Sequence, residues 1–207
     1  MGAIELDKPS KTVFLKLNPL ALLSGTIPVY SGELRGVAEI VASERATYSF
    51  GGSFLYKSPI FEPLLSGPLA VGGNNDRLWG YRFQTEFRYY YLKFTNKKKL
   101  SKILIPSGLY ASLHGSYASA VYRDRDNPFP YYEFLQVDAN VLVGMQVMIS
   151  DAVGLDMFTG LGYKNYAITR KIGSNSRLID PVVAGFFEPY YWPIKFKLGT
   201  ALVFGLL

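Results

Sequence analysis

Polar and apolar residues alternate along the segment GYRFQTEFRYYYLKF, residues 80–94. Successive side chains of an extended strand point to opposite faces, so this alternation predicts a β-strand with one aromatic and one polar face. The aromatic face would carry Tyr81, Phe83, Thr85, Phe87, Tyr89 and Tyr91, and the polar face Arg82, Gln84, Glu86, Arg88 and Tyr90. The alternation recurs along the chain, and no second set of apolar elements is available to cover the apolar faces. This pattern is typical of membrane β-barrels, which are apolar toward lipid and polar toward the lumen.

The same pattern divides the chain into eight predicted strands, at 12–23, 32–42, 46–57, 80–94, 106–123, 131–149, 154–170 and 192–206. We therefore predict an all-β fold, an eight-stranded antiparallel up-and-down transmembrane β-barrel. It would form a single outer-membrane domain over residues 1–207, with residues 1–11 as an N-terminal periplasmic segment.

The predicted connections tend to alternate in length. Residues 43–45 and 150–153 form short connections, whereas 58–79 and 171–191 form long ones. Outer-membrane barrels have short periplasmic turns and longer extracellular loops, so we expect both termini in the periplasm and both long loops outside. The connection at 95–105 is longer than this rule predicts.

Strand parity also assigns a lumen face. The polar network expected there comprises Lys16, Arg35, Glu39, Arg82, Glu86, Arg88, His114, Asp138, Asp156, Lys195 and Lys197. The opposite face is largely Leu, Val, Ile, Ala, Phe and Tyr. Eight strands enclose only enough space for side chains to fill, so we expect a packed network of opposite charges rather than an open pore.

Bulk composition agrees with strands and argues against other classes. Hydrophobic residues make up 49% of the chain and aromatics 15%, which favours β-structure. Apolar runs are too short for a transmembrane helix, and a closed barrel is the other structure that satisfies every backbone group in lipid. The net charge of +6 is spread along the chain, which argues against a nucleic-acid partner. The chain contains no cysteine and no histidine cluster, so we expect neither a cofactor nor a metal site.

The beginning of the sequence, MGAIELDKPSKT, lacks the basic and apolar regions of a signal peptide. A protein that crosses the periplasm should carry such a peptide. We therefore interpret Met1 and Gly2 as residues added at the start of a mature chain. The rival architecture is a soluble, calycin-like barrel with an apolar interior, which would be extracted without detergent.

Two segments resemble a known family. VLVGMQVMISDAVGLDMFTGLGYKNY, residues 141–166, and KTVFLKLNPLALLSG, residues 11–25, resemble the penultimate hairpin and the first strand of Bacteroidota outer-membrane proteins of the DUF3575 type. RYYYLK and GLYASLHGSY match the middle of such chains more loosely. The resemblance implies a small outer-membrane β-barrel of unknown function and brings no catalytic residues with it.

His114 is the single histidine and shares a strand face with Ser116. With a nearby carboxylate such as Glu133, the two would form a Ser/His/acid arrangement, as in a lipid A deacylase-like hydrolase. However, parity places His114 and Ser116 in the lumen and Glu133 on the other face. We expect a buried lumen histidine, with the hydrolase as the enzyme alternative.

Two other groups of residues have simple structural interpretations. Glu86, between Arg82, Arg88 and Lys197, could line an ion path, but lumen salt bridges that hold a narrow barrel together are the expected role. Gly154, Gly160 and Gly162 fall within one predicted strand, where glycine marks curvature or close backbone approach rather than a phosphate loop.

Aromatic residues and prolines gather in two predicted outer loops. They suggest either an interfacial girdle or a docking surface for another protein. We predict an ordered cluster formed by Phe129, Tyr131, Phe187, Tyr190 and Tyr191.

The functional prediction is a non-enzymatic structural or accessory barrel of the bacterial outer membrane, as a subunit of a larger complex. The expected partners are outer-membrane lipids and lipopolysaccharide, together with other outer-membrane proteins. A small passive channel is the non-enzymatic alternative to this prediction.

Overall fold

The computed structural model describes residues 13–22, 31–58, 76–94, 106–124, 131–150, 152–178 and 193–206. The elements are β1 (Val13–Leu17), the 3-10 helix η1 (Pro19–Leu22), β2 (Ser31–Val41), β3 (Ala46–Lys57), β4 (Asp76–Lys93), β5 (Gly108–Asp124), β6 (Tyr131–Met148), β7 (Val153–Ile172), β8 (Asn175–Leu178) and β9 (Ile194–Leu206). In the part of the chain that the structure describes, no helix is long and apolar enough to cross a membrane.

The strands close into a barrel. Each strand from β1 to β7 pairs antiparallel with the next, β7 pairs with β9, and β9 pairs with β1. Eight strands thus form the ring, and β8 pairs only with β7 outside it. The predicted fold, an eight-stranded antiparallel up-and-down barrel, is confirmed.

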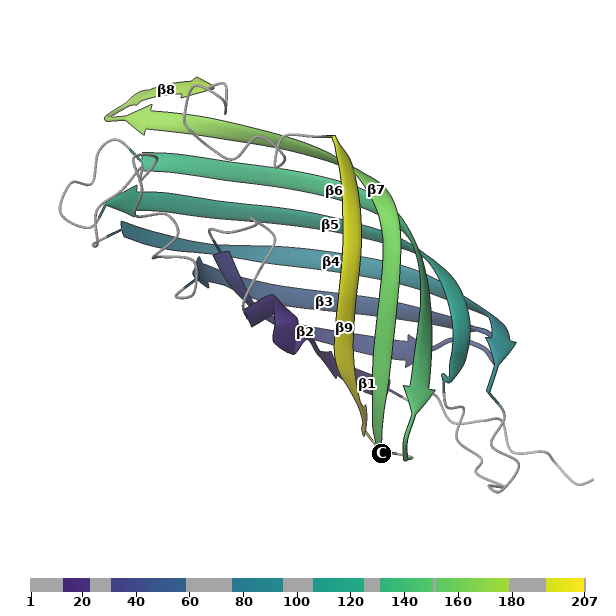
Figure 1. Ribbon diagram of the computed structural model, residues 1–207. Coiled ribbons are helices and arrows are strands. Elements are labelled where there is room, and N and C mark those ends of the chain that lie inside the picture. Colours follow the sequence, from purple (N-terminus) through teal and green to yellow (C-terminus); the bar gives the residue numbers. More distant parts are fainter. Residues whose placement is uncertain are drawn as a thin grey trace, which may run out of the picture.

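One wall of the barrel is taller than the other. Tyr163 of β7 is the last residue that pairs with β9, whereas β7 continues to Ile172 and pairs with β6 and β8. Figure 1 shows the long strands β4 to β7 extending well past the start of β9. The extra height of this wall is at the end of the barrel where residues 58–75 connect β3 to β4. Residues 42–45 connect β2 to β3 at the opposite end.

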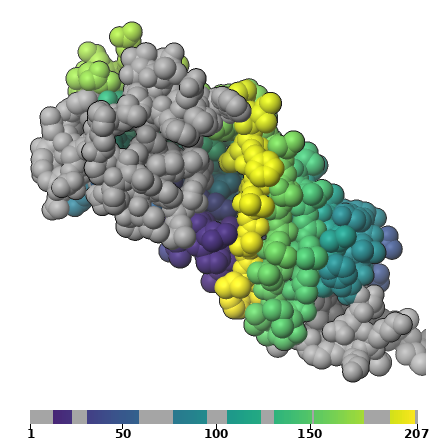
Figure 2. Space-filling model, in the orientation of Figure 1, coloured from purple at the N-terminus to yellow at the C-terminus, as the bar shows by residue number. Residues whose placement is uncertain are grey.

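The predicted first strand, 12–23, is too long. Strand β1 ends at Leu17, and η1 follows it. Proline lacks the backbone N–H that a strand ladder needs, and it restricts the residue before it. The side-chain oxygen of Asn18 accepts a hydrogen bond from the backbone N–H of Ala21 at 3.2 Å, which stabilises the turn at Pro19. Figure 2 shows η1, in purple, packed beside β9, in yellow.

Strand β8 is absent from the prediction, which assigns its residues to a long loop. Gly173 has φ of 59° at the turn between β7 and β8. A residue without Cβ adopts this left-handed conformation at little cost, so the chain reverses there and Asn175 pairs with Ile172. The exposed and mostly polar side chains of β8 gave no apolar alternation from which the strand could be predicted.

The lumen contains apolar layers as well as polar groups. At the long-loop end, one pairing row runs from Leu55 through Gly80, Ala120 and Phe134 to Ile168. The side chains of this row join Leu78 and Ala118 in a buried apolar cluster. At the other end, Phe14, Val41 and Val203 form a second one. The prediction of a polar lumen is therefore wrong at both ends, where inward hydrophobic residues enclose the charged centre.

This layering predicts a difference between two isoleucines. Ile168→Val is expected to cost about 0.5–1.5 kcal/mol of unfolding free energy, since it removes a buried methyl group from the inner apolar cluster. Ile194→Val, on the outer face, is the matched control and should leave the unfolding free energy nearly unchanged. Urea titrations of both variants in lipid vesicles measure the difference, and equal losses would contradict the layered interior.

The outer face of the wall carries large apolar side chains. Its exposed aromatic residues include Tyr48, Phe50, Phe54, Trp79, Tyr81, Phe83, Phe87, Tyr89, Tyr91, Tyr117, Tyr163 and Phe196. The described wall has no charged residue at the outward positions of its strands. The outward positions are the even-numbered ones over 34–40, 46–54 and 194–204 and the odd-numbered ones over 81–91, 111–119, 135–147 and 155–167. Neighbouring outward rings meet across strands, as Tyr48 does with Phe87 at 5.1 Å between ring centroids.

Candidate functional site in the barrel lumen

Lumen-facing residues of the barrel form a connected set of charged and amide groups between the two apolar layers. Each of the eleven residues predicted for the polar network lies in a described strand and takes part in an ion pair or hydrogen bond within the lumen. Nine of the eleven are buried, and the other two, Arg35 and Lys195, have side chains that are 11% and 20% exposed.

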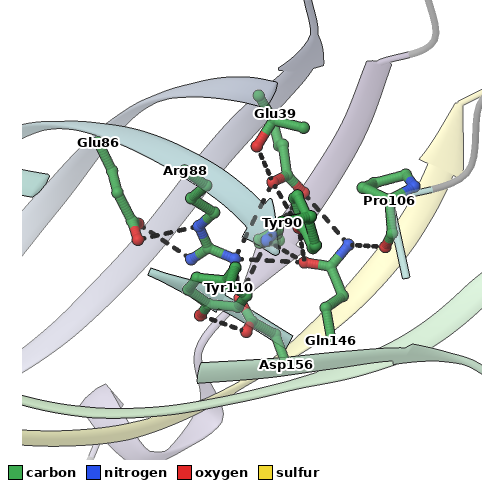
Figure 3. Close-up of polar contacts among 10 residues, drawn as sticks. Glu39, Glu86, Arg88, Tyr90, Pro106, Tyr110, Gln146 and Asp156 are labelled. Carbon is green, nitrogen blue, oxygen red and sulfur yellow. Dashed lines mark hydrogen bonds and ion pairs between the residues drawn. The ribbon is translucent and has the colours of Figure 1, made fainter. Parts of the chain in front are cut away.

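Arg88 is the centre of the group nearest the short turns. Its guanidinium donates to both carboxylate oxygens of Glu86 at 2.9 Å and to Asp156 at 2.6 Å. The same guanidinium lies over the ring of Tyr110, 4.3 Å from its centroid. Figure 3 shows these side chains converging from different strands on one point of the lumen. A planar fork of donors is suited to holding two carboxylates at fixed angles.

Lys16 links β1 to the same group. Its ammonium lies 2.8 Å from Glu39 and 2.9 Å from Asp156. Thr47 donates a further hydrogen bond to Glu39 at 2.7 Å, and Tyr110 donates one to Asp156 at 2.7 Å. Glu39 and Asp156 are therefore each bound by a cation and by at least one hydroxyl donor.

Gln146 and Tyr90 complete the group around Arg88. The side-chain oxygen of Gln146 accepts hydrogen bonds from Arg88 at 3.2 Å and from Tyr90 at 3.3 Å, and its amide donates to the carbonyl of Pro106 at 2.8 Å. Figure 3 shows Gln146 between Tyr90 and Pro106. This amide therefore joins β4 and the residues just before β5 to β6.

A second ion-pair group lies nearer the long-loop end. Arg35 forms a two-pronged pair with Glu33, at 3.0 Å and 2.6 Å. Arg82 approaches the same carboxylate at 3.5 Å, a distance too long for a strong hydrogen bond. Within the part of the chain that the structure describes, the Nε and Nη2 atoms of Arg82 have no hydrogen-bond partner.

A third group surrounds His114. The ring Nδ1 of His114 lies 3.0 Å from the side-chain nitrogen of Asn140, and the ring Nε2 lies 2.8 Å from the ammonium of Lys197. Asn140 donates to Asp138 at 2.7 Å, and Lys195 donates to the other oxygen of Asp138 at 2.8 Å. Both ring nitrogens of His114 are thus engaged by neighbours within the lumen.

The geometry does not assemble the Ser/His/acid arrangement. Ser116 shares the lumen face with His114, but its hydroxyl makes no hydrogen bond to any of the described residues. Glu133 pairs instead with Lys171 at 2.8 Å, and both of these side chains are about one-third exposed. The side chain of His114 is only 1% exposed and lies between Asn140 and Lys197, so the described residues give no support to the hydrolase alternative.

Strand parity also predicts Glu33 and Gln146 on the inward face, and both are buried and bond directly to charged members of the network. Tyr110 was missing from the prediction, although it is buried and donates a hydrogen bond to Asp156. Tyr110 shares strand parity with His114, so parity could have found it. The roles of all three residues depend on contacts between strands far apart in sequence, which parity does not give.

Most of the predicted outer-loop cluster lies outside the described residues, namely Phe129, Phe187, Tyr190 and Tyr191. Tyr131 is described and is half-buried at the start of β6. Its ring centroid lies 6.0 Å from the ammonium of Lys171. Within the described ranges, no group of three or more His, Asp or Glu side chains could hold a metal ion.

No protein-family model matches the chain, and no curated protein matches it. Among solved structures, the chain is similar to a major outer membrane protein from Thermus thermophilus, with a TM-score of 0.48 and 13% sequence identity. That likeness covers 95% of this chain and 100% of the other.

Proposed function

We propose that this protein is a structural or accessory β-barrel of the bacterial outer membrane, without enzymatic activity of its own. The observation that carries the proposal is the contrast between the two faces of the wall. Along the middle of the strands, charged side chains lie on the inner face, and the outer face is apolar and aromatic. A barrel in water gains nothing from this arrangement, whereas a barrel in lipid requires it, because a lipid-facing Lys or Arg costs roughly 2–4 kcal/mol at the midplane.

The outer surface supports lipids as the immediate partners of the barrel. An apolar depression of about 630 Å³ crosses the outside of β3 to β7. Gly115 pairs with Thr85 on one side and with Ala139 on the other, and these three residues line the depression together with Phe87 and Leu113. Acyl chains would fill such a depression in a membrane, whereas in water it would remain exposed apolar surface.

The closed lumen supports an accessory role rather than a channel. Residues of β1, β2, β4 to β7 and β9 line a cavity in the described lumen, which measures about 30 Å³. That space suits two or three water molecules, which need roughly 10–15 Å³ each. Only the outer wall and the loops are then left for contact with another outer-membrane protein, which is the basis for proposing membership in a larger complex.

Cell fractionation tests the membrane assignment. We expect the protein in the outer-membrane fraction, resistant to carbonate and salt, and released only by detergent. Recovery in the soluble fraction without detergent would refute the proposal and favour the calycin-like barrel.

Conductance separates the accessory barrel from the passive channel. Purified protein in planar bilayers is expected to give no stable current steps, because the ion-pair groups fill the lumen. A general porin in the same bilayers serves as the positive control. Reproducible unitary steps would favour the channel.

Photocrosslinking tests the accessory role. A photoreactive amino acid at Leu113, on the outer wall, is expected to give a discrete adduct with another outer-membrane protein in native membranes. The same group at Tyr90, inside the lumen, is the negative control. If Leu113 yields only lipid adducts, membership in a complex through this wall is refuted.

A further inference from the structure

We propose that the barrel binds a small inorganic anion of halide size in the lumen cavity beside Lys197. Such a site goes beyond the proposed function, which requires no ligand. The inference starts from the charges inside the barrel. Between the two apolar layers, the described lumen includes five acidic side chains, Glu33, Glu39, Glu86, Asp138 and Asp156, and seven basic ones, Lys16, Arg35, Arg82, Arg88, Lys164, Lys195 and Lys197.

Close pairing accounts for all five carboxylates. Glu33 is held by Arg35, Asp138 by Lys195, and Glu86 by Arg88, each at 2.9 Å or less. Glu39 and Asp156 are bound by Lys16, at 2.8 Å and 2.9 Å. Four cations thus hold five carboxylates, so one negative charge is left over against Arg82, Lys164 and Lys197. These twelve side chains, seven basic and five acidic, keep a net charge of +2.

Among the described residues, Lys197 is buried with no carboxylate at ion-pair distance, and the one ion pair of Arg82, with Glu33, is long at 3.5 Å. Arg82 is 2% exposed, and its Nε and Nη2 atoms have no hydrogen-bond partner among the described residues. Lys197 is 9% exposed, and its ammonium contacts the ring of His114 at 2.8 Å. An ammonium can donate to the imidazole only if that ring nitrogen is unprotonated, so His114 supplies no negative charge. Buried cations are retained when an anion or another carboxylate compensates them.

The cavity lies beside Lys197 and is not lined by Arg82. The basic residues of its lining are Lys197 from β9, Lys16 from β1, Arg35 from β2 and Arg88 from β4. Glu86 and Asp156 also reach it, but Arg88 holds both of them at 2.9 Å or less. Its volume of about 30 Å³ admits an ion of water size and excludes a lipid headgroup. The geometry therefore favours a halide ion over a larger anion.

Thermal unfolding in two sodium salts tests the site. The detergent-solubilised protein is heated in sodium chloride and in sodium gluconate at equal ionic strength, because gluconate is too large for the cavity. The wild-type Tm is expected to be higher in chloride by roughly 2–6 °C at saturation, since a ligand that binds only the folded state stabilises it. An equal Tm in both salts would overturn the proposal.

Two variants locate the effect. Lys197→Met is expected to abolish the difference between chloride and gluconate, because the cation that lines the cavity is gone. Lys171→Met, which removes a lysine of the exposed pair with Glu133, should keep the wild-type response. If Lys197→Met retains the chloride response, the stabilisation does not come from this cavity and the proposal fails.

Crystals of the wild-type protein grown in bromide provide a measurement that does not depend on any variant. An anomalous bromine peak is expected within hydrogen-bond distance of the Lys197 ammonium. A cavity without such a peak at saturating bromide would overturn the proposal even if the Tm responds to chloride.

Discussion

Arg88→Met is expected to lower the free energy of unfolding by about 3–5 kcal/mol, the cost of breaking a buried ion pair by removing one partner. Arg88 holds Glu86 with two hydrogen bonds and Asp156 with a third. Without Arg88, Glu86 loses the one cation that forms an ion pair with it among the described residues, while Asp156 retains Lys16. The buried carboxylate, rather than the lost attraction, is the main source of the destabilisation.

Urea titration of the variant folded into lipid vesicles measures this loss. Lys171→Met is the matched control, because Lys171 also forms a pair at 2.8 Å, but with both side chains about one-third exposed. Exposed pairs contribute about 0–1 kcal/mol, so the control should change little. If Arg88→Met costs no more than Lys171→Met, water reaches the lumen freely and the barrel is not sealed by this group.

A double variant adds a sharper comparison. Arg88→Met combined with Glu86→Gln should be more stable than Arg88→Met alone, since the second change removes the carboxylate that the first leaves buried and unpaired. The coupling between two groups in one network is read from this cycle. Strictly additive losses would mean that Glu86 finds another partner.

The fold was predictable because one rule of strand geometry applies along the whole chain. Parity alone placed Arg82 and Glu86 inside and Phe83 and Phe87 outside, and the structure has the same arrangement. The rule fails where the backbone leaves the strand, as at Pro19, where η1 replaces the second half of the predicted first strand. It also cannot detect β8, whose four residues are all exposed and show no apolar alternation.

The partners within the lumen could not be predicted in the same way. Lys16 and Asp156 are 140 positions apart in sequence, and their contact follows from the closure and stagger of the ring. Parity likewise grouped Leu55, Phe134 and Ile168 with the polar lumen residues, although these side chains form a separate apolar layer. Which rows of the inner face meet depends on strand register, and register is set by the assembled barrel rather than by any one strand.

The two apolar layers also strengthen the ion pairs of the charged centre. Ion pairs inside a barrel are strong only where water is excluded, because a lower effective dielectric raises the attraction between charges. Phe14 and Val203 close one end of the network, and Leu55 and Phe134 close the other. The inward apolar residues, which the predicted polar lumen did not include, therefore stabilise the charged residues that it did include.

Val141→Arg is expected to destabilise the barrel by about 2–4 kcal/mol in a bilayer, the cost of a lipid-facing arginine near the midplane. Val141 lies near the middle of β6 and is 60% exposed, so in water the same change would be an ordinary surface substitution. Ile149→Arg is the control, because Ile149 is 78% exposed in the short turn after β6, where the cost should fall to about 0–1 kcal/mol. Urea titrations in vesicles compare the two variants. Equal and small losses would mean that the outer face of β6 does not meet lipid, and the membrane assignment would fall with it.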